Sequence, residues 1–258
     1  MSILHESIPL NILIVGGSSG IGLGFVKHFL QPTFSVSHIY ATYRTLESSA
    51  ELIALSQQNS DRLTTLAVDI TQESAIAPAV EQISSQTKTL HLVIYCVGIL
   101  HQGSKFQPEK SLRQIGSDNL LQYFQINSIG AVLLAKHLMP LFKHQDSSVF
   151  AVISAKVGSI GDNRLGGWYG YRASKAALNM FLKTISIEYS RRCPKTIVTA
   201  LHPGTTNTKL SEPFQANVPE GKLFPVSKTV GLLTEVIKNL EQKDSGEFFS
   251  WDGSRLPW

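Results

Sequence analysis

The chain of 258 residues is 43% hydrophobic and 16% charged, and its formal net charge is +4. This composition is typical of a globular protein with a large core and excludes a disordered chain. The basic residues form no long run and no apolar stretch reaches the length of a membrane span, so we expect neither a nucleic-acid partner nor a membrane partner.

Short apolar runs alternate with helical patterns along the chain. The runs predict buried strands at residues 10–15, 37–43, 63–68, 90–97, 149–153, 196–201 and 247–251. Apolar residues at helical spacing predict helices at 21–30, 47–57, 70–83, 118–142, 171–189 and 226–240, the third of them capped by Thr71. Because every connection permits a right-handed crossover, we predict the α/β class. Residues 1–258 would form one Rossmann-like domain, with a doubly wound parallel sheet of about seven strands and helices on both faces.

Residues 1–6 lack the basic and apolar regions of a signal peptide. The two cysteines, Cys96 and Cys193, are far apart, and the histidines are isolated, so we expect neither a disulfide framework nor a bound metal. Cys96 lies in an apolar run and is predicted to be a buried, inert thiol. Together these features predict a cytoplasmic protein.

A glycine-rich segment directly follows the first predicted strand. Its glycines, Gly16, Gly20 and Gly22, form G-x-x-x-G-x-G rather than the G-x-G-x-x-G of ordinary dinucleotide-binding folds. Glycine permits positive φ and close approach of a ligand to the backbone, and the N–H groups that begin a helix attract a pyrophosphate. The segment therefore predicts a dinucleotide site, although it could also be a turn that only packs the helix on the strand.

Arg44 follows the second predicted strand, where the adenosine ribose of a dinucleotide would lie. An acidic residue at this position would bind the 2′-hydroxyl, whereas arginine suits a 2′-phosphate. No Asp or Glu occurs between Ser37 and Thr45. This favours NADP over NAD, with a solvated surface arginine as the alternative.

Tyr171 and Lys175 are four residues apart in a predicted helix and therefore lie on one face of it. A lysine cation about 4 Å from the phenol, at an effective dielectric constant of about 20, would favour the phenolate by roughly 4 kcal/mol before desolvation is counted. We therefore expect the pKa of Tyr171 to fall toward the range of general acid–base catalysis. The pattern alone is weak, because any surface helix can contain it.

The order and spacing of the glycine segment, of Asn127, of Tyr171-x-x-x-Lys175 and of Pro203-Gly204 resemble the short-chain dehydrogenase/reductase family over essentially the whole chain. Within that family, residues 157–163, 166–169, 172–179 and 248–258 are most similar to C-factor cell–cell signalling proteins and to sniffer-type carbonyl reductases. The resemblance implies an assembly of two or four identical subunits.

The resemblance also implies roles for individual residues. Tyr171 would protonate a carbonyl oxygen as hydride arrives from nicotinamide, Lys175 would bind the nicotinamide ribose, and Asn127 would hold a water in a proton relay. The implied cofactor site comprises Gly16, Ser18, Ser19, Gly20, Ile21, Gly22, Arg44, Asp69, Ile70, Gly98, Tyr171, Lys175, Pro203, Gly204, Thr206 and Thr208.

Two features depart from the family pattern. The usual Asn-Asn-Ala-Gly after the fourth strand is Tyr95-Cys96-Val97-Gly98, so only the glycine is retained. The usual Ile-Ser-Ser is Ile-Ser-Ala, which places Ala155 where the catalytic serine would stand. Ser154 is the first candidate for that role and Ser159 the second, while a hydroxyl bonded to the backbone is the structural alternative for Ser154.

The leading hypothesis is an NADP-dependent oxidoreductase that acts on a small carbonyl or alcohol substrate. The alternative is a nucleotide-binding signalling protein with little turnover, and a dehydratase or epimerase is a third possibility. Trp168 and Tyr169 could form a substrate wall or belong to the core. The polar segment at about 211–224 is predicted to be a mobile lid, and its specificity cannot be read from the sequence.

Overall fold

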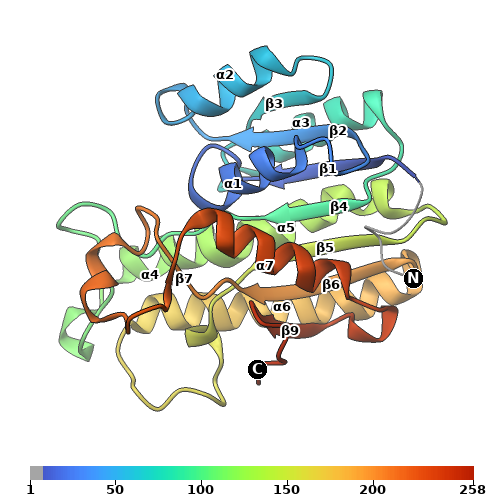
Figure 1. The fold of residues 1–258 in the computed structure, drawn as a ribbon. Helices are drawn as coiled ribbons and strands as arrows, with labels where there is room; N and C mark the ends of the chain where they lie inside the picture. Colours follow the sequence, from blue (N-terminus) through green and yellow to red (C-terminus); the bar gives the residue numbers. More distant parts are fainter. Residues whose placement is uncertain (1–7) are drawn as a thin grey trace.

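The structure is a computed structural model and describes residues 8–258. Residues 1–6, for which we expect no signal peptide, lie outside the described residues. Within the described part, seven strands form one parallel sheet in the order β3-β2-β1-β4-β5-β6-β9 (Figure 1). The strands are β1 Leu10–Val15, β2 Val36–Tyr43, β3 Leu63–Ala67, β4 Leu92–Tyr95, β5 Ser148–Ile153, β6 Thr196–His202 and β9 Glu247–Ser250. The predicted Rossmann-like sheet is confirmed.

Alternate side chains of each strand enter two separate cores, because successive residues of a strand point to opposite faces. Ile12 and Ile14 pack with α1 (Gly20–Phe29), α2 (Ala50–Gln58) and α7 (Val226–Lys238) on one face. Leu13 and Val15 pack with α3 (Glu73–Gln86), α5 (Gly130–Leu138) and α6 (Tyr169–Arg192) on the other. Helices on both faces explain why the central strands β1, β4 and β5 are mostly apolar.

The helix predicted at 118–142 is one continuous rod with a change of winding inside it. It consists of α4 (Ser117–Phe124), a π-helical turn at Gln125–Ile129, α5, and a 3-10 turn at Met139–Phe142. A π turn carries one extra residue and is often found at functional sites. The change of winding therefore marks the neighbourhood of Asn127.

The prediction that Thr71 caps the third helix is wrong. The helix α3 begins at Glu73 with Gln72 at its N-cap position. The Thr71 hydroxyl instead donates a hydrogen bond to the Asp69 carboxylate at 2.7 Å, and the Thr71 N–H donates to the same oxygen at 3.0 Å. Asp favours such a local turn because its short side chain reaches the backbone two residues later, which delays the start of the helix.

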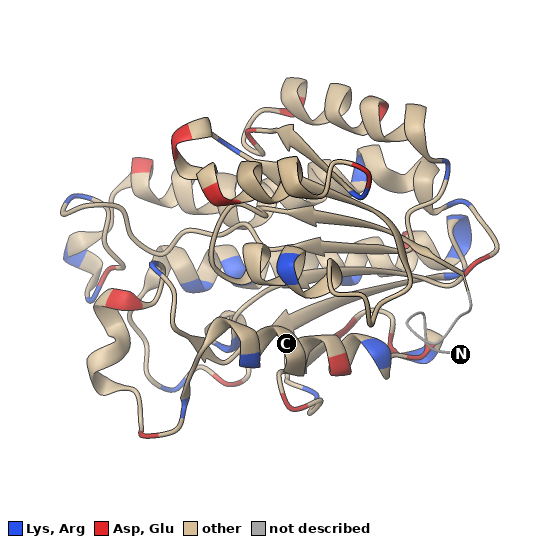
Figure 2. Ribbon diagram, turned by 45° about the horizontal axis from the view of Figure 1, so that its top comes forward, with Lys and Arg blue, Asp and Glu red and all other residues tan. Residues whose placement is uncertain are grey.

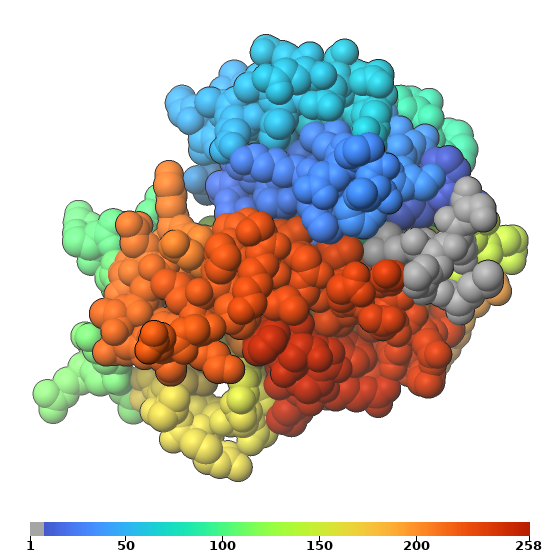
Figure 3. All heavy atoms as spheres, viewed as in Figure 1, coloured from blue at the N-terminus to red at the C-terminus, as the bar shows by residue number. Residues whose placement is uncertain are grey.

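The loops that follow the strands gather at the carboxyl edge of the sheet, on the left of Figure 1. The segment after β6 contains β7 (Thr205–Thr206), a 3-10 turn at Glu212–Asn217 and β8 (Leu223–Phe224), so it is more regular than predicted. In Figure 3 this orange segment lies over the same end of the molecule as the green and yellow loops that follow β4 and β5. A ligand site at this edge is the general rule for open parallel sheets.

Basic and acidic residues are scattered over the helices and loops (Figure 2). Among the residues that the structure describes, no helix combines the length and the apolar character that a bilayer crossing requires.

Candidate active site

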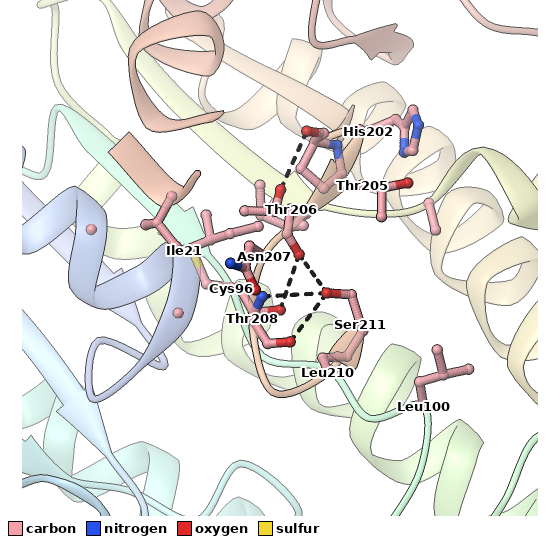
Figure 4. A pocket seen from close by; sticks show the side chains of 18 of the residues that line it. Ile21, Cys96, Leu100, His202, Thr205, Thr206, Asn207, Thr208, Leu210 and Ser211 are labelled. Atoms are coloured by element: carbon pink, nitrogen blue, oxygen red, sulfur yellow. Dashed lines mark hydrogen bonds between the residues drawn. The ribbon is translucent and has the colours of Figure 1, made fainter. Parts of the chain in front are cut away.

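A cavity of about 870 Å³ opens at the carboxyl edge of the sheet (Figure 4). It runs from the glycine-rich turn, past the ends of β4, β5 and β6, to the start of α6. The predicted site residues that line it are Ser19, Gly20, Ile21, Gly98, Ser154, Tyr171, Lys175, Pro203, Gly204, Thr206 and Thr208. Residues predicted separately for a cofactor and for proton transfer therefore share one cavity.

The glycine-rich turn needs its glycines for steric reasons. Gly16 has φ +81° and Gly20 has φ +51°, which side chains rarely tolerate. A Cβ atom on Gly22 would lie 2.1 Å from the Gly16 carbonyl oxygen. The Gly16 N–H donates to the Thr42 hydroxyl at 3.0 Å, which ties the turn to β2. The first turn of α1 contains no acidic residue, so its N–H groups and the helix dipole suit an anion such as a diphosphate.

The loop after β6 meets this turn from the other side of the cavity. The Thr208 methyl group would lie 3.3 Å from a Cβ atom on Gly20. The Ser211 hydroxyl bonds to the backbone oxygens of Thr206, at 2.5 Å, and of Thr208, at 3.1 Å (Figure 4). The Thr206 hydroxyl pairs with that of Thr229 on α7 at 2.8 Å. The loop is therefore held between α7 and the glycine turn.

The other predicted cofactor residues do not line this cavity. Ser18 belongs to the glycine turn, and Ile70 is buried against Gly130. Asp69 and Arg44 follow β3 and β2 at the same edge of the sheet. Arg44 is exposed and forms no ion pair with any residue between 8 and 258. Its guanidinium is therefore available to a ligand that extends beyond the cavity.

Tyr171 and Lys175 lie one turn apart on α6 and are 7% and 3% exposed. The Lys175 ammonium donates a hydrogen bond to the Ile153 carbonyl at 3.0 Å, and burial lowers its pKa to about 8. Burial raises the pKa of the Tyr171 phenol above its ordinary value. This direction is opposite to the one expected from the lysine charge alone, because burial removes water from the phenolate and so penalises the charged form.

Asn127 lies beneath the cavity in the π turn and is fully buried. Its side-chain oxygen accepts from the Ile99 N–H at 2.7 Å, and its amide donates to the Ile99 carbonyl and to the Ser174 hydroxyl, both at 3.0 Å. A Cβ atom on Gly98 would lie 3.4 Å from the Asn127 oxygen and 3.5 Å from the Lys175 nitrogen. Asn127 therefore links the end of β4 to α6 directly behind the lysine.

The two candidates for the serine role, Ser154 and Ser159, and Ala155, which stands at the family's serine position, have different surroundings. The Ser154 hydroxyl is 2% exposed and donates to the Asn179 side-chain oxygen at 2.6 Å. Ala155 lines the cavity, at the position where the family has a hydroxyl. The Ser159 hydroxyl bonds to the Trp258 carbonyl at 3.2 Å and does not line the cavity. The structure therefore brings Ser154 and Ala155 to the site, but not Ser159.

Apolar side chains surround Tyr171 at the inner end of the cavity. The Trp168 ring lies 6.1 Å from the Tyr171 ring and 5.0 Å from the Phe214 ring, centroid to centroid. Leu100 and Leu210 complete this wall (Figure 4). Sequence reasoning missed Phe214, Leu210 and Leu100, although Leu210 and Phe214, two large apolar residues in the largely polar stretch 207–217, were a usable signal.

Two other sequence predictions concern this region. Tyr169 is 37% exposed and does not line the cavity, so only Trp168 of the suggested pair is part of the wall. Cys96 is half-buried and lines the cavity, and burial raises the pKa of its thiol. The prediction that this thiol is buried is therefore wrong, because the end of β4 opens onto the cavity, whereas the raised pKa keeps the thiol protonated.

Residues 10–219 match the family model of short chain dehydrogenases. The NADPH-bound carbonyl reductase from chicken fatty liver superposes with a TM-score of 0.86 at 27% identity, over 97% of this chain and 100% of that chain. The carbonyl reductase Sniffer of D. melanogaster superposes with a TM-score of 0.84 at 28% identity, over the same shares of the two chains.

A signalling protein is also among the relatives. The C-signal of Myxococcus xanthus is 30% identical over 149 residues, which are 57% of this chain and 84% of that protein. The similarity to both subgroups that the sequence motifs predict is therefore confirmed.

Proposed function

The chain belongs to the short-chain dehydrogenase family, and on that premise we propose that it transfers hydride between NADP(H) and a carbonyl or alcohol substrate. One observation carries the proposal: the glycine turn and the Tyr171–Lys175 pair line the same cavity. An anion-binding helix start and a proton donor at opposite ends of one cavity suit a dinucleotide whose reactive ring reaches the donor.

The residues that would hold the cofactor lie along the cavity. The backbone around Gly20 would bind the diphosphate, Lys175 the nicotinamide ribose, and Pro203 to Thr208 the nicotinamide amide. Arg44 would pair with the 2′-phosphate, since it has no acidic neighbour at the end of β2. When bound, NADP(H) supplies or accepts the hydride. The NADPH-bound relative from chicken supports this choice of cofactor.

Tyr171 would act as the general acid toward the carbonyl oxygen. A phenol is protonated at neutral pH and has a proton to give, and burial raises the pKa of this one further. Asn127 and Lys175 both lie beside Gly98, and a water held by Asn127 would return the proton by way of Lys175.

The wall around Tyr171 suits an apolar substrate. Trp168, Phe214 and Leu100 present rings and methyl groups, which favour an aromatic or aliphatic carbonyl compound over a sugar or a carboxylate. The two carbonyl reductases among the similar structures support the same class.

A second candidate function is signalling by nucleotide binding with little turnover. Ala155 favours it, because a missing donor to the carbonyl oxygen costs on the order of 10² to 10³ in rate. The relative named C-signal favours it as well.

The deciding experiment measures NADPH binding by fluorescence and NADPH oxidation with a panel of aldehydes, ketones and quinones, for the wild type and Tyr171→Phe. Turnover by the wild type that falls at least about 100-fold in the variant, with unchanged NADPH affinity, supports the oxidoreductase. Tight NADPH binding without turnover on any compound favours the signalling function. Product formed without stoichiometric consumption of NADPH would indicate a dehydratase or epimerase.

A further inference from the structure

Glu109 is a buried carboxylate that none of the sequence motifs contains. It follows β4 in the loop before α4, and its side chain is 2% exposed. No ion pair of Glu109 is present among residues 8–258. A buried carboxylate without a cation is costly, so its surroundings should reveal what holds it there.

Both polar ends of Glu109 contact the start of α6. Its side-chain oxygen Oε2 accepts the Gly170 N–H at 3.0 Å, and its backbone carbonyl accepts the Trp168 N–H at 2.5 Å. These N–H groups lie at the start of the helix, where backbone N–H groups have no acceptor within the helix itself. Trp168, at the N-cap position, makes no side-chain cap, so Glu109 supplies the cap from another loop.

The turn that Glu109 caps is strained. Trp168 has φ +53°, and it is the one non-glycine residue with a positive φ in the described part of the chain. Such a backbone persists only where its surroundings hold it, and strain of this kind concentrates at functional sites. Arg172 donates to the Gly167 carbonyl at 3.0 Å and holds the turn from the helix side.

The packing leaves little freedom at this point. A Cβ atom on Gly170 would lie 2.4 Å from the Tyr123 ring and 3.0 Å from Oε1 of Glu109. The Tyr123 ring in turn meets the Tyr171 ring edge-on, with 6.2 Å between the centroids. Glu109, Gly170 and Tyr123 thus fix the first turn of α6 one residue before the phenol.

We propose that Glu109 is a positioning residue for the reaction: its carboxylate caps α6 at Gly170 and thereby sets where the Tyr171 hydroxyl stands in the cavity. The inference rests on the proposed oxidoreductase function. A displacement of the reacting group by about 1 Å can cost on the order of 100-fold in rate. The glycine turn lies on a different element, and the Lys175 ammonium is held by the Ile153 carbonyl on β5, so we expect cofactor affinity to depend on this cap much less than kcat does.

The test compares three substitutions of Glu109 in the full chain. In Glu109→Gln the amide oxygen still accepts the Gly170 N–H, so we expect kcat within about 3-fold of the wild type. In Glu109→Ala the acceptor is lost, and in Glu109→Asp the carboxylate is kept but its reach is shorter. For both we expect kcat to fall about 10- to 100-fold, with NADPH affinity within about 2-fold. Lys105→Ala, an exposed position in the same loop, is the control.

Hydrogen exchange of the Gly170 amide separates this inference from the proposed function. We expect faster exchange in the Ala and Asp variants and wild-type exchange in the Gln variant, whether or not the chain turns over any carbonyl compound. If the Gly170 amide of Glu109→Ala exchanged as slowly as in the wild type, the positioning role would be overturned. Faster exchange of this amide with an unchanged kcat would overturn it as well. An inactive Glu109→Gln beside an active Glu109→Asp would overturn it too. The negative charge of the side chain, and not its length, would then be what the reaction requires. A wild type without turnover would refute the oxidoreductase proposal, and the exchange data would still test the cap.

Discussion

The Ser154 hydroxyl donates its hydrogen to the side-chain oxygen of Asn179 at 2.6 Å. A hydroxyl has one hydrogen to donate, so in this arrangement Ser154 has none for a substrate carbonyl. Both residues are buried, which makes the pair part of the connection between β5 and α6. The adjacent Ala155 lines the cavity and carries no donor at all.

We therefore expect Ala155→Ser to raise activity. A hydroxyl at this position would donate to the developing oxyanion, and one such donor is worth on the order of 10² in rate when its geometry is right. We predict a gain of at least about 10-fold in kcat, measured as NADPH oxidation with an aromatic aldehyde. Unchanged or lower kcat with intact NADPH binding would show that the substrate carbonyl does not approach Ala155.

Ser154→Ala is predicted to affect stability more than catalysis. The change removes the hydroxyl and leaves the buried Asn179 oxygen without its donor, which costs about 1–3 kcal/mol of unfolding free energy. Urea unfolding would measure the loss, and kcat should stay within about 10-fold of the wild type. A 100-fold fall in kcat at unchanged stability would instead assign the serine role to Ser154.

The affinity for NADPH should depend on pH through Lys175. Burial places its pKa at about 8, so the ammonium that would bind the ribose is lost as the pH rises through this value. We expect KM for NADPH to be constant below about pH 7 and to rise above pH 8. In Lys175→Met, KM should be high and independent of pH over this range. A constant KM in the wild type up to pH 9 would contradict the assignment.

Substitution of Arg44 should change the choice between cofactors. An arginine–phosphate contact on the surface of the protein contributes about 1.5–3 kcal/mol, so Arg44→Ala should raise KM for NADPH about 10- to 100-fold. KM for NADH, which lacks the phosphate, should not change. Arg113→Ala, at another exposed position, is the control. Equal effects on both cofactors would place the 2′-phosphate elsewhere.

Phe214 should control the preference for aromatic substrates. Truncation to alanine removes the ring that packs on Trp168, so we expect kcat/KM for an aromatic aldehyde to fall about 10-fold or more. A short aliphatic aldehyde, which makes little contact with this wall, should be affected less than about 2-fold. Ile160→Ala, on an exposed neighbouring loop, serves as the matched control. A uniform loss on both aldehydes would point to a general role of the loop.

The sequence by itself determined the fold and the family. Strands buried on both faces are mostly apolar, and helices show their period in the chain, so these local patterns suffice for the sheet and its helices. The glycines of the first turn and the Tyr171–Lys175 pair were also readable, because close backbone approach and one helix face are matters of residue type and spacing. The resemblance to the short-chain dehydrogenase family rested on these same residues.

Only the tertiary structure decided how these residues interact. Burial raises the pKa of Tyr171, whereas the lysine charge alone predicted a fall, because desolvation depends on every neighbour and not on one. Phe214 and Glu109 reach the site from loops about 40 and 60 residues away from Tyr171 along the chain, and no local pattern reports such contacts. The hydrogen bond between Ser154 and Asn179 likewise joins the end of β5 to the middle of α6, which only folding brings together.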